Sequence, residues 1–312
     1  MVNKNMEKSN IFKKNKKKFS IAKSIKRNKN GYLFILPAFI LFAIFFIYPL
    51  VNLFYYSFTD WNGLVPQKNF IGFSNYINMV KDSVFWISMS HNIIWVIIGT
   101  AVPIFIGLIL SVMIWQRKTK GRLFFRVVYF LPVVLAPVVV GIIWNWIYNP
   151  TFGAIDAVLD FIGLGNLSRG WLGSEFSLYA IIIAAMWAFL GFSVVVLLAG
   201  LQNIDMDLIE AARIDGANEV QQFFHIVIPQ LSYNITMVTV YTLIGGFKVF
   251  DIVYIMTRGG PGNVSEVIAT YTYKRAFEFH EIGYGSALSI TILVFALVTS
   301  FIFLKIRERG EV

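Results

Sequence analysis

Six long apolar stretches constrain the fold of this chain more than any other feature. Each is about 20 residues or longer, enough for a helix to cross a hydrocarbon core of about 30 Å. Because lipid offers no hydrogen-bond partner to a free backbone group, such segments must be helical. The high hydrophobic content of 57% agrees with this. We therefore predict an all-α membrane protein with six transmembrane helices, at approximately 33–57, 91–115, 126–147, 178–200, 233–256 and 284–305.

The net charge of +10 is concentrated at the N-terminus. Residues 1–30 contain eleven Lys or Arg and one acid, Glu7, whereas the rest of the chain is balanced. A Lys-rich tail beside an apolar span is typical of a topology determinant attracted to anionic lipid. The sequence beside the tail does not indicate a folded nucleic-acid-binding domain, which argues against nucleic acid as a partner. The first span is too long for a signal peptide, so we interpret it as a retained anchor.

The distribution of basic residues predicts the orientation. If the N-terminus is cytoplasmic, twenty of the 27 Lys and Arg lie on the cytoplasmic side and six on the other. This bias predicts that both termini and the loop 201–232 are cytoplasmic. Five of the nine prolines fall within spans, and Gly245-Gly246 is expected to interrupt the fifth. Such breaks are more typical of a helical bundle that changes conformation than of a static membrane anchor.

Loop 201–232 is expected to form a helical hairpin. Asp205 or Asp207 can cap a first helix, and Gly216 suits a tight turn. A second helix over 218–228 is expected to end at Pro229. Its apolar side chains at helical spacing, which predict one shared face, are Val220, Phe223, Phe224 and Val227.

The charge of this hairpin bears on what it contacts. An amphipathic hairpin on the cytoplasmic side can lie among lipid headgroups or dock a protein partner. Lipid-lying helices usually carry a basic polar face, but the loop holds five acids and a single base, Arg213. The composition therefore favours a protein partner.

The fifth span carries unusual charges for a membrane segment. Lys248 and Asp251 are three residues apart, so on a continuous helix they share one face and can pair. A Lys near mid-span costs roughly 2.5–3.5 kcal/mol on insertion scales, so it should face protein or water. With Phe247 and Phe250, the two charges form a polar patch on a translocation path. Alternatively they form a structural ion pair, or Lys248 extends outward to the membrane surface. The sequence leaves these interpretations open.

Motifs for bond-making chemistry are absent from the sequence. It contains no GxxxxGK[ST] loop, no HExxH, no CxxC and no GxSxG elbow. Its histidines, His91, His225 and His280, are expected on different membrane faces. We therefore expect neither enzymatic activity nor a cofactor in this chain. A stand-alone ion-coupled secondary transporter and a membrane-embedded enzyme remain as alternatives, although inverted repeats and convergent catalytic groups are not evident.

The hairpin closely resembles the EAA motif of permease subunits in binding-protein-dependent ABC importers. The resemblance rests on Glu210-Ala211-Ala212, Asp215-Gly216-Ala217, Phe223, Ile226 and Pro229, with Ile228 where Leu is usual. Other segments resemble the carbohydrate-uptake branch, related to maltose and glycerol-3-phosphate systems. They are LPAFILFAIFFIYPL, SFTDWNG, FIGFSNY, LAGLQNI and GGPGNVSEVIATYTYKRAFEFHEIGYGSALS.

This resemblance implies a type I ABC importer permease fold, with a basic cytoplasmic tail at 1–30 and a transmembrane permease domain at 31–312. It also implies several partners: a second homologous permease subunit, two cytoplasmic subunits that bind ATP and Mg, and an extracytoplasmic solute-binding protein that delivers a sugar. The location would be a prokaryotic cytoplasmic membrane. The residues implied in coupling to the ATP-binding subunits are Glu210, Ala211, Ala212, Asp215, Gly216, Ala217, Phe223 and Pro229. For the translocation path we predict Phe247, Lys248, Phe250 and Asp251.

Overall fold

The computed structural model describes residues 29–115 and 121–308, so residues 1–28 of the predicted basic tail lie outside it. Regular structure in these two ranges is helical, apart from one isolated antiparallel bridge between Thr59 and Phe70. The prediction of an all-α protein is thereby confirmed. The chain divides into two compact units, Met1–Leu53 and Phe54–Val312.

The first unit contains α2 (Lys29–Phe42), the π-helix η1 (Ala43–Ile47) and most of α3 (Tyr48–Tyr56). The π-turn lies directly before Pro49. A proline cannot donate to the carbonyl four residues earlier, and its ring crowds that carbonyl. A wider turn relieves the crowding, so the apolar segment stays helical through the proline.

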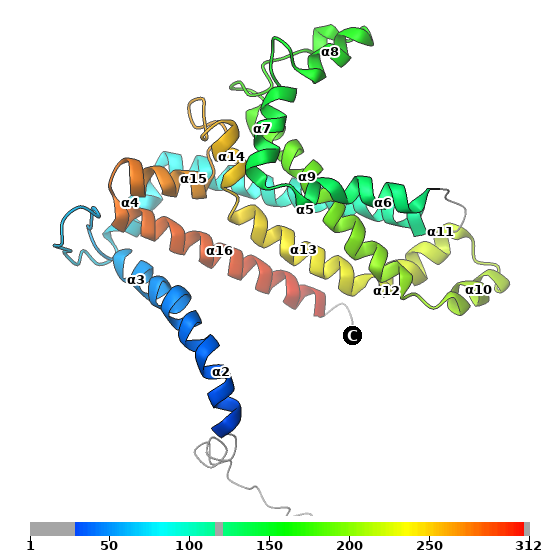
Figure 1. The fold of residues 1–312 in the computed structure, drawn as a ribbon, viewed down its shortest axis with the longest axis horizontal. Helices are drawn as coiled ribbons and strands as arrows, with labels where there is room; N and C mark the ends of the chain where they lie inside the picture. The colour runs from blue at the N-terminus through cyan, green and yellow to red at the C-terminus, as the bar shows by residue number, and fades with distance from the viewer. Residues whose placement is uncertain (1–28, 116–120, 309–312) are drawn as a thin grey trace, which may run out of the picture. The chain divides into compact units, whose positions relative to one another are not determined.

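The second unit is built from helices joined by loops, the longer of which cover residues 57–73 and 257–267 (Figure 1). Its elements are α4 (Ser74–Lys81), α5 (Ser83–Trp115), α6 (Arg122–Phe130), η2 (Leu131–Val134), α7 (Pro137–Ile147), α8 (Ala154–Phe161), η3 (Gly165–Leu167), α9 (Ser177–Gln202), α10 (Met206–Ile214), α11 (Glu219–Gln222), η4 (Phe223–Val227), α12 (Ile228–Gln230), α13 (Ser232–Phe247), α14 (Asp251–Met256), α15 (Ile268–Tyr273), η5 (Lys274–Glu278) and α16 (Ile282–Glu308).

Helix α9 is the centre of this unit. It packs against α5, α6, α7 and α13, and α13 in turn lies along α16 (Figure 1). Along α9, Ile181, Ala184, Val194 and Leu197 are fully buried. A helix that is apolar all round is expected to be surrounded by other helices or lipid, and here protein covers much of it.

Four helical segments in the described ranges are long and apolar enough to cross a membrane: 31–56, α5, α9 and α16. Two bent helix pairs bring the number of candidate spans to six if each pair counts as one span. Leu123–Val134 meets Pro137–Ile147 at 103°, and Glu219–Gln230 meets Ser232–Phe247 at 64°. The predicted third span, 126–147, is therefore not one straight helix. Pro132 and Pro137 explain the bend, because neither has the N–H that a continuous helix needs there.

The predicted fifth span, 233–256, is also divided. Helix α13 ends at Phe247, and α14 begins at Asp251 after a non-helical step. The expected interruption at Gly245-Gly246 is wrong, since both glycines lie inside α13. Gly246 serves close packing instead: a Cβ there would lie 2.8 Å from the Val96 Cγ2 on α5. Small residues let membrane helices approach each other closely in this way.

A carboxylate ties the last two helices to the start of α5. Asp82, between α4 and α5, accepts hydrogen bonds from the hydroxyls of Tyr271 on α15 and Tyr284 on α16, the latter at 2.7 Å. Partial burial opposes ionisation of Asp82, but the hydrogen bonds from the two tyrosines and from the backbone of Val84 and Phe85 together outweigh it and hold its pKa below the ordinary value. The carboxylate is therefore a charged cross-link among three helices.

Candidate functional site

A cavity of about 410 Å³ lies among α5, α7, α9, α13 and the segment that follows α13. This volume is typical of small-ligand sites, which are mostly apolar with a few polar groups. Trp95 on α5 and Met186 on α9 supply part of the apolar wall, and the prolines of the bent third span, Pro132 and Pro137, supply another part. The bend that divides this span thus contributes directly to the cavity.

Three of the four residues predicted for a translocation path line this cavity. Lys248, Phe250 and Asp251 contribute to its wall. Phe247 does not, because it is buried and packs against Val96 and Ala296. Since Phe247 is the last residue of α13, its side chain still points into the helix-packing face, whereas the break after it turns the following residues towards the cavity.

Lys248 and Asp251 do not form the ion pair that a continuous helix would allow. In the part of the chain that the structure describes, the ion pairs are Lys274–Glu266 and Arg275–Glu281. The break places Lys248 at the end of α13 and Asp251 at the start of α14, so the helical i, i+3 geometry is lost. Both side chains are exposed and available to the cavity.

An aromatic cluster forms another wall of the cavity. The ring of Tyr241 on α13 stacks with Phe189 and Phe192 on α9, at centroid distances of 5.4 and 4.9 Å. All three residues line the cavity. Rigid ring faces next to the charged groups of Lys248 and Asp251 give the cavity both apolar and polar surface.

Reasoning from the sequence missed this cluster. The spacing of Phe189 and Phe192 places them on one helix face, which is a usable signal. That spacing does not show whether the face contacts lipid, protein or a cavity. Tyr241 is some fifty residues further along, and only the packing of α13 on α9 brings it to the two phenylalanines.

The hairpin 201–232 is held by specific local contacts. Of the two expected caps, Asp205 is the one that caps α10, accepting from the Asp207 N–H at 3.0 Å. Gly216 has φ +86°, a conformation in which glycine is favoured, so the chain can turn there. Asn218 and Gln221 then form a reciprocal capping box, with bonds of 2.8 and 2.9 Å, that starts α11.

The predicted apolar face of the second hairpin helix is wrong. Val227 is buried and Phe223 half-buried, whereas Val220 and Phe224 are 64% and 59% exposed. The π-helix Phe223–Val227 explains this, because a wider turn rotates the residues on either side of it relative to each other. Helical structure also continues past Pro229 to Gln230, contrary to the predicted end. As at Pro49, a π-turn precedes the proline.

The hairpin is anchored to the helices that border the cavity. Ile209 of α10 and Val227 of η4 are buried with Leu201 of α9 and Leu231 at the start of α13. Because α9 and α13 both line the cavity, displacement of the hairpin would act directly on two of its walls.

The residues implied in coupling lie mostly on the outside of this hairpin. Exposed members are Glu210, Ala211, Asp215, Gly216 and Pro229, whereas Ala212, Ala217 and Phe223 are half-buried. Large apolar side chains lie exposed beside them, including Ile214 at 86%. An exposed surface that mixes acidic and apolar groups suits a protein partner better than lipid headgroups.

Comparison with known proteins places this architecture among membrane transport components. Residues 103–309 match the family described as binding-protein-dependent transport system inner membrane component. The chain is 37% identical over 282 residues to a probable ABC transporter permease protein, YurN, of Bacillus subtilis, covering 90% of this chain and 96% of that one. It is 33% identical to the trehalose/maltose transport system permease protein MalF of Thermococcus litoralis, covering 89% and 93%.

A solved structure shows the same fold. The crystal structure of a bacterial ABC transporter involved in the import of the acidic polysaccharide alginate aligns with a TM-score of 0.78 at 25% identity, covering 93% of this chain and 98% of that one. The chain therefore belongs to the binding-protein-dependent transport system inner membrane components. It is a multi-pass membrane permease subunit with the type I importer fold, which sets aside the enzyme and secondary-transporter alternatives.

Proposed function

We propose that this chain is the membrane-spanning permease subunit of an ATP-binding-cassette importer that takes up a sugar. The cavity carries this proposal, because stacked aromatic rings and exposed charges line it together. A sugar ring has an apolar face of C–H groups and a rim of hydroxyls. Tyr241, Phe189 and Phe192 suit the face, while Lys248 and Asp251 suit the hydroxyls. Two similar proteins, named for trehalose/maltose transport and alginate import, support a saccharide.

Partners supply what this chain lacks. A solute-binding protein on the outer face would deliver the sugar, as the name of the family suggests. A second, homologous permease subunit would complete the pathway, and two cytoplasmic subunits would bind ATP and Mg. With both termini in the cytoplasm of a prokaryotic cell, hairpin 201–232 faces the ATP-binding subunits. Its exposed Glu210, Asp215 and Ile214 then form the docking surface.

Coupling would run through the buried cluster beneath the hairpin. Closure of the ATP-binding subunits moves α10 and the following turns as a rigid unit. Ile209 and Val227 pass this motion to Leu201 and Leu231, and so to α9 and α13. Phe189, Phe192 and Tyr241 ride on these two helices, so the aromatic wall would open to one side of the membrane and then to the other.

Uptake by the complete transporter in proteoliposomes tests both parts of this proposal. We expect ATP-dependent uptake of a labelled sugar, and loss of uptake in Glu210→Lys and Gly216→Asp while the subunit still inserts. The substitution Lys305→Gln, in the last turn of α16, is a control that should retain uptake. Normal uptake by both hairpin variants would refute the coupling assignment. ATP-dependent uptake of a solute other than a sugar would refute the substrate class.

A further inference from the structure

The break after α13 leaves helix-end carbonyls that need hydrogen-bond donors. The side-chain amide of Asn92, on α5, supplies them: its Nδ2 donates to the carbonyl of Gly246 at 2.9 Å and to that of Phe247 at 3.2 Å. Asn92 itself is fully buried. A single side chain on a neighbouring helix thus fixes the end of α13, directly before the cavity wall Lys248–Ile252.

The same amide also holds the other end of the segment 248–267. The backbone N–H of Ile268, the first residue of α15, donates to Asn92 Oδ1 at 2.8 Å. Beside it, His91 Nδ1 lies 2.8 Å from the carbonyl oxygen of Glu266. Because a carbonyl can only accept, the ring nitrogen carries the proton. The two ends of segment 248–267 are therefore held at one place on α5, by two consecutive residues of that helix.

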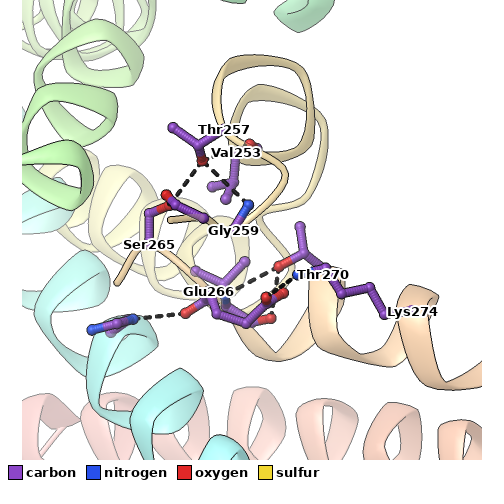
Figure 2. Close-up of polar contacts among 10 residues, drawn as sticks. Val253, Thr257, Gly259, Ser265, Glu266, Thr270 and Lys274 are labelled. Atoms are coloured by element: carbon purple, nitrogen blue, oxygen red, sulfur yellow. Dashed lines mark hydrogen bonds and ion pairs between the residues drawn. The ribbon is translucent and has the colours of Figure 1, made fainter. Parts of the chain in front are cut away.

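Between these anchors the chain forms a loop with its own internal bonds. The hydroxyls of Thr257 and Ser265 are 2.8 Å apart, and the Gly259 N–H donates to Thr257 Oγ1 at 3.2 Å (Figure 2). The hydroxyl of Ser265 also reaches the carbonyl of Gly260, at 2.9 Å. Such closely spaced bonds make residues 257–265 a compact element.

A buried ion pair closes the base of this loop. The Glu266 carboxylate is fully buried and pairs with Lys274 on η5 (Figure 2). Gly259 packs directly on that carboxylate, where a Cβ would collide with it. Helix α14, with Ile252, Val253 and Met256 buried, runs from the loop to the cavity wall. A displacement of the loop is thus transmitted to the wall over a short, well-packed path.

We propose that Asn92 is a positioning residue that sets the place of the cavity wall Lys248–Ile252 and joins it to the loop 257–266. The three hydrogen bonds of its amide all go to the ends of this segment, and Asn92 is not among the residues that line the cavity. In the proposed orientation the loop lies on the outer face, where the binding protein docks. Docking that displaces the loop would then move Lys248 and Asp251 through Asn92. This last step rests on the proposed function, but the positioning of the wall does not.

Cysteine accessibility tests the positioning directly, because the natural chain contains no cysteine. Val249→Cys reports on the wall held by Asn92, and Ala185→Cys reports on the part of the same cavity wall that α9 supplies. Each is placed in the assembled transporter with Asn92 intact, with Asn92→Asp and with Asn92→Leu. The rate of reaction with a water-soluble maleimide is then measured.

We expect Asn92→Leu to raise the labelling rate at Val249→Cys about tenfold, because loss of a buried hydrogen-bonding group shifts local opening by that order. Asn92→Asp keeps the acceptor for the Ile268 N–H but loses both donors, so it should also raise the rate. Labelling at Ala185→Cys should change less than about twofold. Equal rates at Val249→Cys in all three backgrounds, or equal increases at both reporters, would overturn the proposal.

Asn75 provides a matched control. Its buried Nδ2 also donates to two carbonyls, those of Ser57 and Thr59, each at 2.9 Å, but it does not touch residues 248–267. Asn75→Leu should therefore leave labelling at Val249→Cys unchanged, and an increase equal to that of Asn92→Leu would count against a specific role.

Kinetics give a second measurement. Asn92→Asp should raise KM for the sugar more than it lowers the maximal rate, since the displaced wall carries Lys248 and Asp251. A fall in maximal rate alone would contradict wall positioning. Because labelling needs no transport, absence of sugar uptake would refute the proposed function and leave the positioning proposal standing on the labelling result.

Discussion

Two adjacent glycines in α13 should respond in opposite ways to the same added methyl group. A Cβ on Gly245 would meet no atom within 4 Å. A Cβ on Gly246 would lie 2.8 Å from Val96 Cγ2, 3.2 Å from Val96 Cα and 3.3 Å from Trp95 Cδ1, all on α5. The short contact to the Val96 backbone cannot be relieved by a side-chain rotation alone, so α13 must move away from α5.

The two substitutions share one favourable contribution and differ in one unfavourable contribution. In a helix interior, replacing Gly with Ala stabilises by roughly 0.5–1 kcal/mol. At Gly245 this gain stands alone. Overpacking of a well-filled interior costs typically about 1–3 kcal/mol, and at Gly246 this cost opposes the gain. The gain in helix propensity is the same at both positions and cancels when the two variants are compared. Gly246→Ala should therefore be about 1–3 kcal/mol less stable than Gly245→Ala.

Thermal unfolding of the two purified variants in the same detergent measures the difference. For a domain of this order of size, about 1 kcal/mol corresponds to a shift in Tm of roughly 2–4 °C. We therefore expect Gly245→Ala to melt at or above the wild-type temperature and Gly246→Ala to melt several degrees below Gly245→Ala. Equal melting temperatures, or a higher one for Gly246→Ala, would refute the claim that Gly246 is required for close packing of α13 on α5.

Three further perturbations test other parts of the structure. Because the pKa of Asp82 is lowered in the folded protein, its contribution to stability is complete above the unfolded pKa of about 3.9 and is lost as the pH falls through the lower folded pKa. Asp82→Asn should therefore reduce the fall in Tm that the wild type shows at acidic pH. Lys274→Met leaves the buried Glu266 carboxylate unpaired and should cost about 3–5 kcal/mol of stability, and adding Glu266→Gln should recover part of this loss in the same melting assay. Tyr241→Ala removes one stacked face of the cavity and should lower kcat/KM for uptake about tenfold, whereas Tyr241→Phe should not; equal uptake by both would rule out stacking as its role.

Local rules anticipated the features whose cause lies within a few residues of chain. The capping of α10 by an aspartate, expected at Asp205 or Asp207 and found at Asp205, follows from its side-chain oxygen, and the turn at Gly216 follows from the backbone freedom of glycine. The apolar lengths of α5, α9 and α16 follow from the thickness of the hydrocarbon core. In each case the neighbours in sequence are also the neighbours that exert the force.

The errors in the hairpin and in the fifth span have a different origin. A π-turn before Pro229 changed the helical phase, so that Val220 and Val227 no longer share a face. Helical periodicity assumes an unbroken α-helix and has no term for a widened turn. Likewise, the pair Gly245-Gly246 predicted a break in the helix, but the break falls at 248–250. There Asn92 on another helix donates to the carbonyls of Gly246 and Phe247 that the break leaves free.

Hydropathy and charge asymmetry were sufficient to predict a helical membrane protein with a cytoplasmic hairpin, because lipid solvation and helix capping act locally on consecutive residues. The class of permease was predicted from the resemblance of the residues around Glu210 to a known family motif. Reasoning from the sequence selected Lys248, Phe250 and Asp251 but did not reach the rest of the cavity wall. That wall joins Trp95, Phe189, Tyr241 and Lys248, which are far apart in sequence. Whether an apolar side chain on a membrane helix faces lipid, another helix or a cavity changes its local sequence pattern very little, so only the packing of α5, α9 and α13 decides which residues line the cavity.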